Sequence, residues 1–524
     1  MSHAKLSFIA IWFLCCVGLA DNAAAQTPLP KGAILRIGPG NETKPPGGYI
    51  VTFSENGKQI LTGSERLVIC DAFTGKRLRE LPAVFDDTNL GGSSTHGHFI
   101  GTYNTDGTLE VWQTQTGKRL ETFKRKTERH PCHLAIDGST VAFVKDFTVH
   151  LLETKTSNLL HKWQLPKERA LFSWRTQYGE AQLRFSPTGQ SIVTMQYFVL
   201  GRRTGMGLKV RTWDTKSGTL WSTVVLQDLK QVLHPWPCVV SPDDRLLCLA
   251  TPDLKLAVYE IVSGQLLAEF DTQRASALRW PEAAFSPDGR CFAYYGEDDN
   301  IRVVDLATRK ILNVFTGHET WVTSLAFSPD GKRLASADTN DTTYVWQLSK
   351  PKPQTQSVPP KELNRLWIVL SSRDPKAGYR AVTKLGHLPT QAVALIQNRL
   401  KKTDSSPEVI EQLIRDLDSK SFRTRTRAEK KLVYLGSTVE KTLRTHIQKN
   451  IPLETRLRIE RILPKLKGLP PEVLQQLRAT AVLEAIGTKK ARAILQEMAQ
   501  TPLSLLSQKM AQCALTRLEN RKQQ

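Results

Sequence analysis

A short turn sequence recurs along the first two-thirds of the chain, and it constrains the fold more than any other feature. It reads Phe-Ser-Pro-Asp-Gly at residues 285–289 and 327–331, and variants of it occupy residues 53–57, 185–189 and 240–244. Alternating apolar residues lie on both sides of each turn, which is the pattern of a β-hairpin. Repetition of such a unit predicts an array of similar small β-sheets.

A second turn recurs with the first and marks the last strand of a unit. It reads Thr-Gly or Ser-Gly at residues 74–75, 116–117, 217–218 and 263–264. The spacing of the two turns, close to the roughly 40–45 residues of a propeller blade, predicts seven units. These units span approximately residues 49–81, 82–123, 133–165, 181–226, 236–270, 281–315 and 321–348.

The last unit carries enough of the pattern to suggest a family. It begins with Gly317 and His318, contains the turn at residues 327–331, and has Trp346 near the end of its third strand. This segment closely resembles one WD40 repeat. The resemblance implies an all-β fold over residues 33–349, a seven-bladed WD40 β-propeller.

The resemblance also implies a structural hydrogen-bond network within a blade. In the family a His, a Ser or Thr, an Asp and a Trp can form it, and His318, Ser336 and Trp346 match three of these. The usual Asp, six residues before the Trp, is replaced by Asn340, with Asp341 beside it. We therefore expect a weakened network in this blade.

The two ends of the repeat array predict how it closes. The last unit has three strands and then runs into Pro351 and Pro353, which cannot continue a sheet. Residues 33–37, with the sequence Ala-Ile-Leu-Arg-Ile, precede the first unit and would otherwise have no partner. We expect them to form the fourth strand of the last unit, because this exchange protects exposed edges.

Residues 1–25 have the features of a secretory signal peptide. An apolar run occupies residues 6–19, and three alanines at residues 23–25 suit cleavage before Gln26. The run is shorter than the roughly 20 residues that a spanning helix needs, and we expect no transmembrane span in the mature chain. Export to the periplasm, the cell envelope or the medium is therefore expected. An uncleaved leader that anchors the chain in a membrane is the alternative.

The last third of the chain changes in pattern and in charge. Residues 350–361 are rich in Pro, Gln and Ser and predict a linker, whereas apolar residues recur with a helical period from 362 to 524. Residues 351–524 contain 33 Lys and Arg against 15 Asp and Glu, which gives +18 of the total net charge of +22. Short helices separated by Pro or Gly resemble HEAT repeats, so we expect a basic, all-α, HEAT-like domain.

The mature chain also resembles a group of bacterial WD40 proteins that is common in planctomycetes. The shared features are a leader, the Leu-Pro-Lys-Gly-Ala stretch at residues 29–33, and the helical segment at residues 410–419. The group has no general biochemical activity that could be transferred to this chain.

Lys and Arg cluster at two places in the helical tail and form a candidate anionic surface. Such a surface can attract nucleic acid, anionic lipid or an acidic polymer, and simple solvation of the helices is the alternative. Alternate positions do not share one helical face, so we expect the first cluster to wrap around its helix. The residues are Arg423, Arg425, Arg427, Lys430, Lys431, Arg456, Arg458 and Arg461.

Long loops around the fourth unit are the best candidate for a partner-binding site. In WD40 propellers the loops between units and the loops between second and third strands lie on one face. Here both are enlarged and rich in aromatic residues and Arg, which interface centres use; packing onto the propeller itself is the alternative. The residues are Arg169, Phe172, Trp174, Arg175, Tyr178, Tyr197, Phe198, Arg202, Arg203, His234 and Trp236.

No recognisable catalytic motif is present in the sequence. Gly-x-Ser-x-Gly, His-Glu-x-x-His, a Walker loop and Cys-x-x-Cys-His are all missing, and the cysteines lack zinc-like spacing. We therefore expect no catalytic, cofactor-binding or metal-binding residues. Cys238 and Cys248 flank one tight turn and are plausible cross-strand neighbours, although small buried thiols are the simpler interpretation.

These features favour a non-enzymatic, protein-binding scaffold. The propeller would present an interaction face, and the basic tail would dock a second partner or an acidic polymer of the cell envelope. One alternative is a propeller enzyme that acts on polysaccharide. Another is a cytoplasmic, nucleic-acid-associated scaffold whose leader has been misread; an exported protein is not expected to bind nucleic acid.

Overall fold

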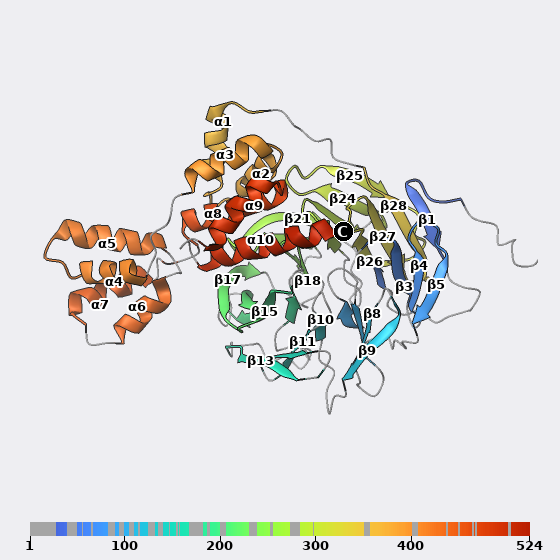
Figure 1. Cartoon of the computed structure of the whole chain (residues 1–524), viewed down its shortest axis with the longest axis horizontal. Helices are drawn as coiled ribbons and strands as arrows, with labels where there is room; N and C mark the ends of the chain where they lie inside the picture. The colour runs from blue at the N-terminus through green and yellow to red at the C-terminus, as the bar shows by residue number, and fades with distance from the viewer. Residues whose placement is uncertain are drawn as a thin grey trace, which may run out of the picture.

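Strands fill the first two-thirds of the chain and helices fill the last third (Figure 1). The protein is described from a computed structural model. The leader at residues 1–25 and most of the linker at 350–361 lie outside the described residues. The structure describes residues 28–38, 50–54, 56–63, 67–81, 90–93, 99–103, 109–113, 116–123, 132–134, 140–145, 147–153, 156, 158–166, 182–185, 189–199, 206–229, 238–251, 255–272, 283–296, 298–349, 357–400, 407–435, 439–448, 451–463, 466, 469–500 and 505–523.

The described strands form seven four-stranded antiparallel sheets, each consistent with a WD40 propeller blade. In six sheets the strands follow one another in chain order. These sheets are β2 (Ile50–Phe53), β3 (Gln59–Gly63), β4 (Leu67–Asp71) and β5 (Arg77–Leu81); β6 (Leu90–Ser93), β7 (Phe99–Tyr103), β8 (Leu109–Gln113) and β9 (Lys118–Phe123); β10 (Cys132–Leu134), β11 (Thr140–Lys145), β12 (Thr148–Glu153) and β13 (Leu159–Gln164); β14 (Gln182–Phe185), β15 (Ser191–Val199), β16 (Met206–Asp214) and β17 (Leu220–Leu229); β18 (Cys238–Val240), β19 (Leu246–Ala250), β20 (Lys255–Glu260) and β21 (Gln265–Asp271); and β22 (Ala283–Phe285), β23 (Cys291–Tyr295), β24 (Ile301–Asp305) and β25 (Ile311–Phe315).

The seventh sheet joins the two ends of the repeat array. It contains β26 (Val322–Phe327), β27 (Arg333–Asp338), β28 (Thr343–Gln347) and, at its outer edge, β1 (Ala33–Ile37). β1 runs antiparallel to β28, with Leu35 opposite Val345. The prediction that residues 33–37 supply the missing strand is confirmed.

Apolar side chains pack each sheet against its neighbours in chain order. Burial of such surface contributes about 25 cal/mol per Å², so these contacts hold the array together. Six junctions have a buried cluster with members from both sheets, such as Val51 and Ala335, Leu61 and Trp112, Leu151 and Phe185, Met195 and Leu249, Phe270 and Phe292, and Phe315 and Trp346. The second and third sheets meet where β6 contacts β10.

The last sheet contains a complete hydrogen-bond network. His318 Nε2 and Trp346 Nε1 lie 2.6 Å and 2.7 Å from Ser336 Oγ, and His318 Nδ1 lies 2.8 Å from Asp338 Oδ2. The expectation of a weakened network is therefore wrong. The carboxylate comes from Asp338 at the end of β27, not from the position six residues before the Trp. Its Oδ1 also accepts the amides of Asn340 and Thr342, which holds the following turn.

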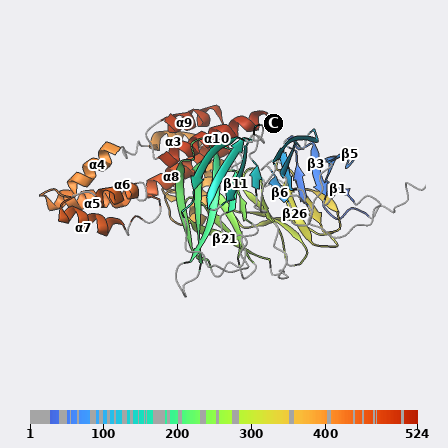
Figure 2. The ribbon, with the colours of Figure 1, turned by 90° about the horizontal axis from the view of Figure 1, so that it is seen from below.

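Ten helices of the described chain follow the sheets, and they pack as two groups with separate apolar cores (Figures 1 and 2). The docked helices, which lie against the sheets, are α1 (Pro360–Val369), α2 (Pro375–Gly386), α3 (Pro389–Arg399), α8 (Pro471–Ile486), α9 (Lys489–Gln500) and α10 (Leu505–Gln523). The four-helix unit, which projects away from the sheets, comprises α4 (Pro407–Asp416), α5 (Phe422–Leu435), α6 (Glu440–Ile447) and α7 (Leu453–Ile462).

The four-helix unit is an insertion between α3 and α8. Leu385 of α2, Ile396 of α3 and Leu483 of α8 share one core, so the docked helices pack together across the insertion. Leu432 of α5 and Ile459 of α7 belong to the second core, which contains only residues near α4–α7. The tail that sequence analysis treats as one helical domain thus holds two apolar cores. None of the described helices is both long and apolar enough to cross a membrane.

The register of β18 and β19 bears on the cysteine pair. Cys238 lies opposite Leu249, and Cys248 lies opposite Val239. The two cysteines are therefore not directly paired across the ladder. Cys248 is a free, buried thiol, as the simpler interpretation expects for this residue.

The network in the last sheet yields a test of stability. Ser336→Ala should lower the free energy of unfolding by about 2 kcal/mol, because buried His318 and Trp346 each lose a hydrogen-bond partner. Denaturant unfolding measures this change. Ser357→Ala, at an exposed position before α1, is the matched control and should have no effect. Equal stabilities of the two variants would contradict a structural role for the network.

Candidate functional site

The docked helices sit on the turns at one end of the fourth, fifth and sixth sheets (Figure 2). The hydroxyl of Tyr379 in α2 donates to the carbonyl of Gly289 at 2.7 Å, and Arg380 Nε donates to the carbonyl of Ala307 at 3.1 Å. Gln190 Nε2 donates to Thr516 Oγ1 of α10 at 2.8 Å. The sheet residues lie in turns between first and second or third and fourth strands, which all fall at one end of an antiparallel sheet.

Arg478 of α8 forms the most extensive of these contacts. Its Nε and Nη2 donate to Glu260 at 2.8 Å and 2.6 Å, and its Nη1 donates to the carbonyls of Leu370 and Ser372. Both partners of the ion pair are less than 10% exposed. A Cβ at position 378 would overlap the guanidinium, so the glycine there makes room for it. Five N–H donors in a fixed plane suit this shared use.

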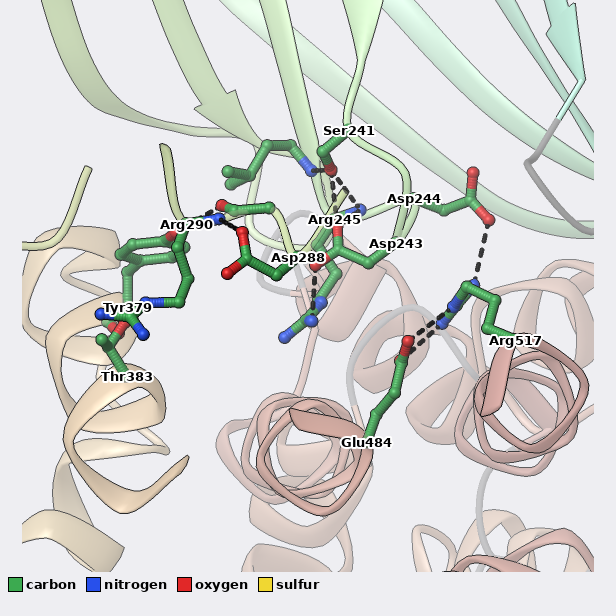
Figure 3. Close-up of polar contacts among 12 residues, drawn as sticks. Ser241, Asp243, Asp244, Arg245, Asp288, Arg290, Tyr379, Thr383, Glu484 and Arg517 are labelled. Carbon is green, nitrogen blue, oxygen red and sulfur yellow. Dashed lines mark hydrogen bonds and ion pairs between the residues drawn. The ribbon is translucent and has the colours of Figure 1, made fainter. Parts of the chain in front are cut away.

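A second buried arginine links two docked helices to a sheet turn (Figure 3). Arg517 of α10 donates to both carboxylate oxygens of Glu484 in α8, at 2.8 Å and 2.9 Å. Its Nη1 also lies 3.4 Å from Asp244 Oδ2 in the turn between β18 and β19. Lys509 of α10 extends the contact, since its Nζ lies 3.3 Å from Asp214 Oδ2. Removal of one partner from a buried pair of this kind is strongly destabilising.

Asp244 occupies a position where the repeated turn has glycine. Gly289 and Gly331 hold the equivalent place with φ of 68° and 64°, and Asp244 adopts φ of 58° there. Aspartate tolerates this left-handed conformation better than most residues. The exchange of Gly for Asp in an otherwise regular turn is the sequence signal for this contact, and sequence analysis missed it.

The negative charge of the buried Asp244 carboxylate is only partly stabilised by its neighbours. Burial raises its pKa to about 7, and the neighbouring Asp243 and Glu484 add to the increase, while Arg517 and Arg245 oppose it. Arg517 is already paired with Glu484, and Asp244 Oδ1 has no hydrogen-bond partner among the described residues. Asp243 behaves differently: despite burial, Arg245 and the hydroxyl of Ser241 lower its pKa.

The loop between β15 and β16 leaves the fourth sheet at the end opposite the docked helices. The strand ends Val199 and Met206 face each other across the loop between β15 and β16, opposite the turn that holds Gln190. Nine of the predicted residues lie outside the described part of the chain: Arg169, Phe172, Trp174, Arg175, Tyr178, Arg202, Arg203, His234 and Trp236. Their grouping therefore stays a prediction.

The remaining two predicted partner residues lie in β15. Tyr197 pairs with Leu208 across the ladder. The ring of Phe198 packs over Gly207, where a Cβ would overlap it, and Lys209 Nζ lies 4.7 Å from the ring centroid. Phe198 thus packs on its own sheet, as the alternative interpretation of this cluster expects.

The predicted anionic surface divides into exposed and internal residues. Arg458 of α7 is buried and pairs with Glu429 of α5 at 3.2 Å and with Glu454 at 2.6 Å, so it does not contribute to the surface. Arg425 is half-buried, and its Nη1 donates to the carbonyls of Ser419 and Lys420 after α4. Arg456 is half-buried. The exposed members are Arg423, Arg427, Lys430, Lys431 and Arg461.

The exposed bases of α5 form a stripe, contrary to the wrapped arrangement that sequence analysis expects. With Arg425 turned toward the end of α4, the remaining positions 423, 427, 430 and 431 are spaced as i, i+4, i+7 and i+8, which share one helical face. Among the described residues, no three His, Cys, Asp or Glu side chains are placed to hold a metal ion.

The position of Asp244 predicts a pH dependence of stability. With a folded-state pKa of about 7 against an ordinary value of 3.8, the folded protein binds this proton more tightly, so stability falls as pH rises from 4 to 7. The loss is at most about 1.4 kcal/mol per pH unit. Asp244→Asn should flatten this fall, as measured by denaturant unfolding at pH 5.5 and 7.5.

Asp298→Asn is the matched control for the pH experiment. The hydrogen bonds and charge of Arg302 lower the pKa of Asp298 to about 2, so this residue does not titrate in the tested range. The control should keep the wild-type pH dependence. If Asp244→Asn also keeps it, Asp244 does not carry the buried proton.

Comparison with known proteins agrees with the repeat pattern. Residues 309–347 match the family described as WD domain, G-beta repeat. The chain is 27% identical over 148 residues to the meiotic recombination protein rec14 of Schizosaccharomyces pombe, covering 28% of this chain and 46% of that protein. It is 31% identical over 140 residues to the 66 kDa stress protein of Physarum polycephalum, covering 25% of this chain and 23% of that protein.

A bacterial relative shows the same repeat. An uncharacterized WD repeat-containing protein of Synechocystis, sll1491, is 27% identical over 109 residues, which are 21% of this chain and 30% of that protein. The chain spans less than half the length of the first curated relatives that it matches. These matches show that the chain contains a repeat of the WD40 type at residues 309–347, and the four-stranded sheets and the His-Ser-Asp-Trp network agree with it.

Proposed function

We propose that this protein is a non-enzymatic scaffold in which a seven-bladed propeller binds a partner protein at the end of its sheets opposite the docked helices. The observation that carries the proposal is the buried ion pair between Arg478 and Glu260, reinforced by Arg517 and Asp244. These contacts commit one end of the fourth, fifth and sixth sheets to the chain's own helices. A partner therefore meets the loops at the other end.

The contacts between consecutive sheets support closure of the seven sheets into one ring. Apolar clusters or direct strand contacts join each sheet to the next, and the cluster of Val51 and Ala335 joins the last sheet to the first. Seven sheets with seven junctions leave no free end. A closed ring presents its loops on a rigid support, which is the arrangement that binding proteins use.

The names of several relatives describe proteins that act with other proteins. The zebrafish p21-activated protein kinase-interacting protein 1-like is 23% identical over half of this chain, and the fission-yeast Set1 complex component swd2 is 29% identical over 21% of it. Binding of a partner protein by this chain is in keeping with these names. The names do not identify the partner of this chain, because the matched segments are repeats that many proteins share.

The four-helix unit supplies a second docking surface in this proposal. It has its own apolar core and projects from the remainder of the chain (Figure 1). Its stripe of exposed Arg and Lys on α5 favours a partner with negative charge. The scaffold would then hold two partners at separate places.

The loop cluster is tested by a triple substitution in the full-length protein. Trp174→Ala with Arg202→Ala and Arg203→Ala should remove the propeller's partner from affinity purifications of the tagged protein from its own cells, measured by quantitative mass spectrometry. Loss of an aromatic and arginine centre typically costs an interface 2 kcal/mol or more, roughly thirtyfold in affinity. The melting temperature should not change.

The matched control removes charge elsewhere. Arg365→Ala with Lys376→Ala changes two cations of the docked helices and should leave the co-purified proteins unchanged. Identical protein sets from the triple variant and the wild type would overturn the assignment of the loop cluster.

We also propose that the protein is exported, on the basis of the leader at residues 1–25. N-terminal sequencing of the native protein should find Gln26 as the first residue, in a periplasmic, envelope or extracellular fraction. An intact Met1 in the cytoplasm would contradict export, and an intact Met1 in membranes would indicate an anchored scaffold.

A further inference from the structure

We propose that a single proton controls how tightly α8 and α10 dock on the fifth sheet, and that the carboxyl of Asp244 carries it. The helices are held when this carboxyl is neutral, and they open from the sheet more readily when it is ionised. The basis is a buried cluster at the interface that contains more carboxylates than cations (Figure 3). The inference goes beyond the proposed function, because it concerns contacts within the chain and neither partner surface.

The cluster lies where the turn between β18 and β19 meets the two helices (Figure 3). Its five charged residues come from three elements: Asp243, Asp244 and Arg245 from the turn, Glu484 from α8 and Arg517 from α10. The side chain of Arg245 is 19% exposed, and the other four are less than 10% exposed. Three carboxylates therefore share two guanidinium groups away from water.

Both guanidinium groups already have a carboxylate partner. Arg245 Nη2 lies 2.5 Å from Asp243 Oδ2, and Arg517 donates to both carboxylate oxygens of Glu484. For the carboxylate of Asp244, the described residues supply one ion pair, with Arg517 Nη1 at 3.4 Å, and its Oδ1 has no hydrogen-bond partner among them. A buried carboxylate without a cation of its own favours proton uptake, because burial penalises the charged form.

Charged groups on the neighbouring elements do not supply the missing cation. Lys509 of α10 pairs with Asp214 of the fourth sheet, and Arg290 of the sixth sheet lies 3.8 Å from Asp305. The thiol of Cys513 in α10 stays protonated, because burial raises its pKa to about 12. With two cations and three carboxylates, the buried cluster carries a net charge of −1, which one bound proton neutralises.

Docking of the helices is what makes this proton bind. Without α8 and α10 above it, the turn would face water, and Asp244 would have its ordinary pKa of 3.8. In the docked protein, burial raises the pKa to about 7, and the charges of Asp243 and Glu484 add to the increase. The docked form binds the proton more tightly, so the contribution of this group to docking is complete below pH 4 and is lost as the pH rises through 7.

Cys513 supplies a reporter for opening of this interface. It is a free thiol, 1% exposed, and it lies four residues before Arg517 on the same face of α10. Its reaction with N-ethylmaleimide in the full-length protein therefore requires that α10 separate from its neighbours. The labelling rate, measured by peptide mass spectrometry and divided by the rate in the urea-unfolded chain at the same pH, should increase about twentyfold from pH 5.5 to 7.5.

Two substitutions separate the proton of Asp244 from other effects. Asp244→Asn mimics the neutral carboxyl and suits the φ of 58° at this position, so labelling at pH 7.5 should fall to the wild-type rate at pH 5.5. Asp214→Asn removes another carboxylate that contacts α10. Burial opposes ionisation of Asp214, but hydrogen bonds from Ser217 and Lys509 lower its pKa, so this control should keep the twentyfold increase.

Cys70 of the first sheet is the internal control. It is buried in a sheet outside the three on which the docked helices sit, so its labelling reports unfolding of the sheets. Its rate at pH 7.5 should stay below that of Cys513. Equal rates for the two thiols would overturn the inference, because the proton would then act on global stability and not on docking. A flat pH profile in the wild type, or an unchanged profile in Asp244→Asn, would overturn it as well.

Discussion

Two buried guanidinium groups hold the helical part of this protein to its sheets. Arg478 joins α8 to Glu260, and Arg517 joins α8, α10 and the turn at Asp244. A buried charge is tolerated only where its hydrogen bonds are satisfied, so such pairs specify one docking geometry rather than add general attraction. Together with the hydrogen bonds of Tyr379 and Arg380 and the apolar contacts of α8 and α10 with Trp221 and Val262, these two side chains fix the end of the sheets that the helices occupy.

This docking divides the described molecule into a framework of sheets and docked helices and a projecting four-helix unit. The sheets and the docked helices share contacts through turns at one end, which makes the helices part of the support. The other end of the sheets and the projecting four-helix unit remain as separate surfaces (Figure 2). The insertion between α3 and α8 explains how a tail can be both fixed to the sheets and extended from them.

Several features were predicted correctly from the sequence because they depend on short segments of the chain. The repeated turn predicted the hairpins, and the unpaired segment at residues 33–37 predicted the closing strand. Predictions based on residue spacing failed where the fold brings other residues into contact. The network carboxylate was assigned to a fixed distance from Trp346, yet Asp338 reaches His318 from the end of β27. Arg425 and Arg458 looked like surface cations, yet both serve contacts within the four-helix unit.

The sequence by itself determined the repeat, the change from strands to helices and the concentration of positive charge in the tail, because turn chemistry, hydrophobic periodicity and composition are properties of short segments. Only the tertiary structure decided which helices share a core, which cations remain exposed and which end of the sheets is covered. Those outcomes depend on contacts between residues such as Glu260 and Arg478, 218 positions apart, whose proximity no local pattern encodes.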